Sequence, residues 1–263
     1  IKWKYFNWLN PINITSPQTT NIGNFESSSG NKLYLVKIPD RNQYFLVENR
    51  QQIGYDTYLP ESGIIIYHVD EDMWSNNGPP NYPNFEIEVE DPTFNAYRTS
   101  AAFSKNDGQT EFSSRTALNS NSNEGTPSYV SIYNIGDEGN SMQVSFSFNS
   151  QLVDIYNDGG STLSISDITG PSWISIEPKT FNIAPNSFKI IDTRFDNSIS
   201  QGYYTSDLKI YSNDPVENTA SIPISLNLSK NNAPSIYPPV WWVGTYTNNP
   251  VTLNLSAHEK DVE

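Results

Sequence analysis

Hydrophobic and polar residues alternate in short runs along most of the chain, with a period of two rather than the 3.6 of a helix. The clearest run ends the first half of the chain, where Met142, Val144, Phe146 and Phe148 alternate with Ser and Gln. Alternation of this kind places one face of a strand in a core and the other in solvent. Turn residues, above all 18 Pro and 14 Gly, separate the runs. The pattern predicts an all-β protein built from tandem β-sandwich domains.

The first predicted domain covers residues 1–150. Its strands are expected at residues 32–38, 43–49, 63–70, 84–90, 129–133 and 141–148. The first two should form a hairpin, and the run at 63–70 is apolar on both faces, which indicates a central strand covered on both sides. Residues 93–127 are polar and predict loops.

The second predicted domain covers residues 151–230. Several short strands separated by Pro and Gly turns predict an immunoglobulin-like sandwich here. Its core is expected from Leu163, Ile165, Trp173, Ile174, Ile190, Phe195, Tyr203, Leu208, Ile210, Ile222, Ile224 and Leu226. After a polar linker that ends in Pro234, residues 231–263 are expected to be the truncated start of a further extracellular β repeat, with a strand near 250–256.

Composition narrows the classes of function. The formal net charge is −14, which argues against a nucleic-acid partner because phosphate neutralisation needs clustered Lys and Arg. The acidic surface has two interpretations, solubility and the binding of divalent cations. The chain has no Cys, so disulfides and thiolate metal sites are excluded, and no run approaches the ~18 apolar residues of a membrane span.

Four acidic residues are candidate metal ligands. Asp70 and Asp72 follow the predicted central strand, and Glu90 and Asp91 end the next one. Carboxylate oxygens at alternating positions near a loop rich in Asn and Gly are the ligands that calcium prefers. The alternative interpretation is a solvated acidic loop. Calcium is the cofactor that these residues predict.

Catalytic residues are not predicted in this chain. A zinc protease needs two His one helical turn apart, whereas the two His here, His68 and His258, lie far apart in the sequence. We expect His68 to be a buried strand-end imidazole hydrogen-bonded to backbone, and His258 to be an exposed loop residue. Glu48 and Arg50 share one face of a strand and predict a structural ion pair.

Several stretches of the first domain resemble the segment that follows the catalytic domain in the M6 (immune inhibitor A-like) family of secreted zinc metalloproteases. They are residues 6–11, 44–51, 54–56, 59–60, 63–71, 112–113 and 130–135. The resemblance implies a bacterial or archaeal, extracellular or cell-surface protein. It also implies that zinc belongs only to a catalytic domain before Ile1, and that this domain is a partner in the same polypeptide. We therefore expect the chain to be part of a longer protein.

The second domain is similar to the immunoglobulin-like (ASH/HYDIN-type) repeats of large bacterial surface and secreted proteins. The similarity rests on residues 157–163, 173–178, 202–204 and 212–215, the last of which read Ser-Asn-Asp-Pro. Two hypotheses follow. The chain is either a non-catalytic accessory region of a secreted metalloprotease that contacts protein substrates or the cell surface, or a structural or adhesive surface or filament protein with no protease activity.

Overall fold

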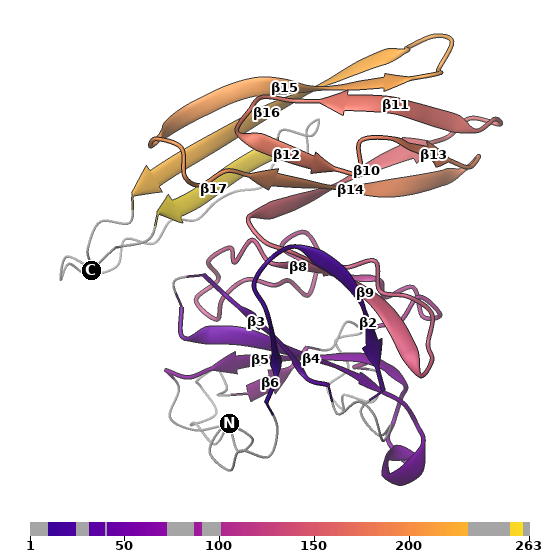
Figure 1. Cartoon of the computed structure of the whole chain (residues 1–263), viewed down its shortest axis with the longest axis vertical. Coiled ribbons are helices and arrows are strands. Elements are labelled where there is room, and N and C mark those ends of the chain that lie inside the picture. The colour runs from indigo at the N-terminus through magenta and orange to yellow at the C-terminus, as the bar shows by residue number, and fades with distance from the viewer. Residues whose placement is uncertain are drawn as a thin grey trace. The chain divides into compact units, whose positions relative to one another are not determined.

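The computed structural model describes residues 10–24, 32–39, 41–72, 87–90, 101–230 and 253–259. These residues form an all-β structure, and the only helical turn among them is a short 3₁₀ segment, η1 (Gly54–Asp56) (Figure 1). The chain divides into two compact units, Ile1–Phe148 and Asn149–Glu263. No helix in the described part of the chain is long and apolar enough to cross a membrane.

The first unit contains two sheets. The first sheet has the order β1 (Ile12–Ile14), β3 (Tyr34–Lys37), β4 (Gln43–Arg50), β5 (Gly63–Asp70) and β6 (Ile87–Val89). The second has the order β2 (Gln18–Gly23), β9 (Ser141–Ser147), β8 (Ser131–Tyr133) and β7 (Glu111–Phe112). All neighbours are antiparallel except β1 and β3, which are parallel. The predicted hairpin is therefore confirmed as β3 and β4.

Side chains from both sheets meet in one hydrophobic core. Phe45 from β4 contacts Phe112 from β7 edge to face, with ring centroids 5.1 Å apart, and Phe103 packs against Phe112 at 6.0 Å. The opposite face of the first sheet is also buried, and its side chains form a smaller cluster that includes Leu46 and Val69. The prediction of a central strand covered on both sides is thus confirmed for β5, since Ile64, Ile66 and Val69 are all buried.

The second unit also contains two sheets. One has the order β10 (Ser150–Asn157), β14 (Ser187–Phe195) and β12 (Ile174–Glu177). The other has the order β13 (Phe181–Ile183), β11 (Leu163–Thr169), β15 (Gly202–Ser212), β16 (Thr219–Lys230) and β17 (Leu253–Glu259). β17 runs parallel to β16, and the other pairs are antiparallel.

The predicted core of the second unit is mostly buried. Trp173 is 8% exposed and its ring lies 6.1 Å from that of Tyr204. The prediction for Tyr203 is wrong, because its side chain is 70% exposed. Tyr203 and Tyr204 are adjacent on β15, so they point to opposite faces, and the buried Leu208 shares the face of Tyr204.

Residues 253–259 form the edge strand β17, beside β16. His258 therefore lies in a strand, and its prediction as a loop residue is wrong. The linker predicted before this strand lies outside the described residues. The division into three domains stays a prediction.

Candidate functional site

The candidate site lies at one end of β4 and β5, on the face that looks toward the second sheet of the first unit. Gln43 pairs with Asp70 and Phe45 pairs with His68 across the two strands. Alternate residues of a strand point to the same face. The side chain of Gln43 therefore points the same way as that of Phe45. Those of His68 and Asp70 point the same way as that of the buried Ile66. Gln43, His68 and Asp70 are all buried.

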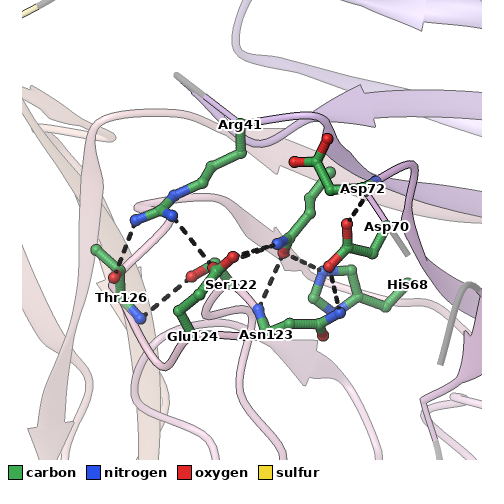
Figure 2. A network of polar contacts seen from close by, with 9 residues as sticks. Arg41, His68, Asp70, Asp72, Ser122, Asn123, Glu124 and Thr126 are labelled. Carbon is green, nitrogen blue, oxygen red and sulfur yellow. Dashed lines mark hydrogen bonds and ion pairs between the residues drawn. The ribbon is translucent and has the colours of Figure 1, made fainter. Parts of the chain in front are cut away.

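A polar loop between β7 and β8 contacts two of these side chains, Gln43 and Asp70, and lies beside them in Figure 2. The Asn123 backbone N–H donates to Gln43 Oε1 at 2.9 Å, and its side-chain amide donates to Asp70 Oδ2 at 2.8 Å. Gln43 Nε2 donates to both carboxylate oxygens of Glu124, at 3.1 and 3.2 Å. Each contact joins the loop to the strands. We call this cluster of Gln43, Asp70, Asn123 and Glu124 the loop clamp.

Arg41 adds a charged contact at the exposed side of the loop clamp. Its Nη1 lies 3.3 Å from Glu124 Oε2, and its Nη2 donates to Thr126 Oγ1 at 3.1 Å. Partial burial acts to raise the pKa of Glu124, but hydrogen bonds from Ser122 and backbone, together with Arg41 and Gln43, lower it overall. The ionised form of Glu124 is therefore the one that the folded loop favours.

The hydrogen bonds of Gln43 also orient the ring of His68. Gln43 directs its NH₂ group to a carboxylate, so its oxygen is the acceptor for the Asn123 N–H and for His68 Nε2 at 3.1 Å. His68 Nε2 must then carry a hydrogen. The other ring nitrogen, Nδ1, lies 3.4 Å from Glu90 Oε1, and both groups are buried.

Three of the four predicted calcium ligands lie within the described residues. Asp70 Oδ1 accepts a hydrogen bond from the Asp72 backbone N–H at 3.0 Å, and Asp72 Oδ1 accepts one from Asn42 Nδ2 at 2.8 Å. Glu90 contacts His68 instead of the two aspartates. Asp91 lies outside the described residues.

Among the side chains that the structure describes, no group of three or more His, Cys, Asp and Glu could hold a metal ion. Calcium binding at Asp70, Asp72, Glu90 and Asp91 stays a prediction. His68 differs from its prediction in one respect, because its ring contacts the Gln43 and Glu90 side chains rather than backbone.

A second polar cluster lies on the opposite face of the first sheet. Arg50 Nη2 donates to Glu48 Oε1 at 2.5 Å and to the Tyr67 hydroxyl at 2.8 Å, and that hydroxyl donates to Glu48 at 2.9 Å. This confirms the predicted ion pair. Burial raises the pKa of Tyr67, and the Glu48 carboxylate raises it further. Burial acts to lower the pKa of Arg50, but Glu48, Tyr67 and Asp56 raise it overall.

A small cavity of about 120 Å³ adjoins this cluster and is lined by Arg50 and Tyr67 together with Leu59, Pro60 and Ile65, among others. The Arg50 charge facing it is already matched by Glu48. The cluster therefore has the character of a structural ion pair at the edge of an apolar hollow, rather than of an anion-binding site.

Sequence reasoning missed the central member of the loop clamp. Gln43 carried a signal, since it is a polar residue at an inward position of a strand whose next inward residues are Phe45 and Val47. Asn123 and Glu124 carried none, because a polar loop has no period that assigns a direction to its side chains.

Comparison with known proteins finds no matching protein-family model, no similar curated protein and no matching solved structure.

Proposed function

We propose that the chain is a non-catalytic accessory region of a secreted or cell-surface zinc metalloprotease. In this proposal the region supports a catalytic domain of the same polypeptide, which carries the zinc, and contacts protein substrates or cell-surface components. The two units are then tandem β-sandwiches, the second immunoglobulin-like.

One observation carries the proposal. The longest stretches that resemble the M6 family, residues 44–51 and 63–71, form most of the adjacent strands β4 and β5 at the centre of the first unit. They therefore form two inner strands of the first sheet, and the loop clamp bonds to these strands through Gln43 and Asp70. A resemblance located in a central strand pair favours a shared domain over a chance match in a loop.

The second unit supports the accessory role independently of the first. Its two sheets pack through side chains of β12 and β15, since a Cβ built on Gly170 would lie 2.7 Å from Leu208 and 3.2 Å from Ile174. Two sheets with a shared core form a rigid module without cofactors, which suits a spacer or a recognition domain.

The direct test is to determine the coding sequence upstream of Ile1. The proposal expects a domain with a His-Glu-x-x-His helix, because two imidazoles one turn apart can bind the same zinc. An upstream sequence with further β repeats and no such helix would contradict it and would favour the structural or adhesive alternative.

A further inference from the structure

The outer face of the larger sheet of the second unit carries an open groove of about 330 Å³. It lies over β15 and β16, the two long adjacent strands of that sheet (Figure 1). Its lining combines an aromatic ring, a carboxylate and hydroxyl groups, from Tyr203, Thr205, Asp207, Pro223 and Ser225, with Ser206 and Ile224 between them.

Strand register explains why these groups share one surface. The outward-facing side chains of β15 are Tyr203, Thr205 and Asp207. They alternate along the strand with inward-facing side chains such as Tyr204 and Leu208. Across the pair, Thr205 lies opposite Ser225 and Asp207 opposite Pro223. The groove therefore lies on the outward side of the strand pair, where Tyr203, Thr205, Asp207 and Pro223 are exposed and Ser225 is buried, and the other side packs in the core.

Three polar side chains of the groove are available to a ligand, those of Tyr203, Thr205 and Asp207. Within the described part of the chain, the side chains of Tyr203, Thr205 and Asp207 make no hydrogen bond or ion pair. Tyr203 is also the most exposed aromatic residue described in the second unit, at 70%. An exposed ring held on a rigid strand loses little conformational entropy when it packs against a partner.

The surroundings narrow the class of ligand. An added peptide strand pairs its backbone at the edge of a sheet, whereas this groove lies on the face of the sheet, over two strands that are paired with each other. An anionic ligand is disfavoured by Asp207 and by the net charge of −14. An apolar helix is disfavoured because most lining side chains carry hydroxyl or carboxylate groups.

We propose that this groove binds an uncharged oligosaccharide. The apolar face of a sugar ring packs on the Tyr203 ring, and sugar hydroxyls donate to the Asp207 carboxylate and exchange hydrogen bonds with Thr205. Tyr203 and Asp207 lie four residues apart, about 13 Å along the strand, so the ligand is a chain of sugars rather than a single ring. This site goes beyond the proposed function and depends on the second unit alone.

The test measures retardation of the whole chain in native gels that contain a soluble neutral polysaccharide, with a β-glucan, a mannan and a xylan as separate probes. Alginate serves as the anionic probe. At least one neutral polysaccharide should retard the wild-type chain. Tyr203→Ala should weaken that binding by about tenfold or more, Asp207→Asn should also weaken it, and Tyr203→Phe should retain most of it, because the ring remains.

Tyr156→Ala is the matched control, since Tyr156 is a 60% exposed tyrosine on β10, in the other sheet of the same unit. It should leave binding unchanged. All the substituted side chains are exposed, and unaltered melting curves would verify that the variants fold. The proposal is overturned if none of the three neutral polysaccharides retards the chain, if only alginate does, or if Tyr203→Ala and Tyr156→Ala bind equally well.

Discussion

Gln43 shows at the scale of one residue how a buried amide can organise a site. Its oxygen accepts hydrogen bonds from Asn123 and His68, and its NH₂ group donates to Glu124. A buried donor or acceptor without a partner costs more than a hydrogen bond contributes, so each of these groups depends on the others. Asn49 acts similarly elsewhere on β4, donating to the carbonyl oxygens of Ile22 and Gly139.

Replacing Gln43 tests the loop clamp. Gln43→Ala should lower the free energy of unfolding by about 1–3 kcal/mol, because the His68 ring and the Asn123 N–H lose their buried acceptor. Gln143→Ala is the control, since Gln143 is exposed on β9 of the same unit, and it should change stability by less than about 0.5 kcal/mol. Denaturant unfolding of both variants gives the comparison, and equal midpoints would contradict the role assigned to Gln43.

The pH dependence of stability tests Glu124. Its pKa is lowered in the folded protein, so ionised Glu124 stabilises the fold above the unfolded value of about 4.3, and this contribution is lost as the pH falls through the lower folded pKa. The difference in unfolding free energy between wild type and Glu124→Gln should be largest near neutral pH and shrink below about pH 4. A difference that stays constant across this range would show that the carboxylate charge has no part in the clamp.

The exposed Tyr203 shows a limit of prediction from single residues. Two adjacent tyrosines have equal hydrophobicity, so the pair by itself favours neither as the inward one. The direction follows from alternation along the strand, since Tyr204 shares a face with the buried Leu208 and Ile210. A prediction made from the hydrophobicity of each tyrosine alone therefore assigns both to the core.

At the scale of elements, strands with a clear hydrophobic pattern were predictable and strands with a polar one were not. The prediction for residues 63–70 coincides with β5, and that for 43–49 lacks only the last residue of β4. β2 was missed because its sequence, QTTNIG, places only Ile22 in the core, and its conformation comes from antiparallel pairing with β9. Pairing with a distant strand leaves no local signal.

Gly63 begins β5 at a point where another segment approaches its backbone. Ile64 and Phe103 exchange two backbone hydrogen bonds, of 2.9 and 2.8 Å. A Cβ on Gly63 would lie 2.9 Å from both Ala102 Cβ and the Phe103 oxygen, and Gly63 has a φ of +143°. The close contact and the left-handed backbone both require glycine.

Substitution at this position should therefore be costly. Gly63→Ala should lower the free energy of unfolding by about 1–3 kcal/mol. Gly23→Ala is the matched control, because a Cβ on Gly23 meets nothing within 4 Å, and it should be neutral or slightly stabilising. Thermal or denaturant melts of the two variants decide the matter, and a neutral Gly63→Ala would mean that the 101–103 segment is free to shift.

At the scale of the whole molecule, each of the two units has its own sheets and its own core. The all-β class was predictable from alternation, because a hydrophobic period of two over many short runs is typical of strands and not of helices. The order of strands within each sheet was not, since neighbours such as β2 and β9 lie far apart in the sequence and no local feature records their contact.

The second unit should fold without the first. We expect residues 149–263 expressed alone to unfold cooperatively, with Trp173 as a main core residue. Trp173→Ala should cost about 3–5 kcal/mol, the range for truncating a buried aromatic side chain. In the whole chain the same variant should shift only one of two unfolding transitions. A non-cooperative curve for the isolated unit, or an unchanged midpoint for the variant, would contradict this account.

The most direct measurement of the central claim is casein cleavage by two proteins, the complete polypeptide and residues 1–263 alone, each with zinc and with a chelator. Under the proposed function, a complete polypeptide should cleave casein with zinc and lose this activity in the chelator, because the proposal places the catalytic metal in a preceding domain. Residues 1–263 alone should not cleave casein under either condition. Chelator-sensitive cleavage by residues 1–263 alone, or none by the complete polypeptide, would contradict the assignment as an accessory region of a zinc metalloprotease.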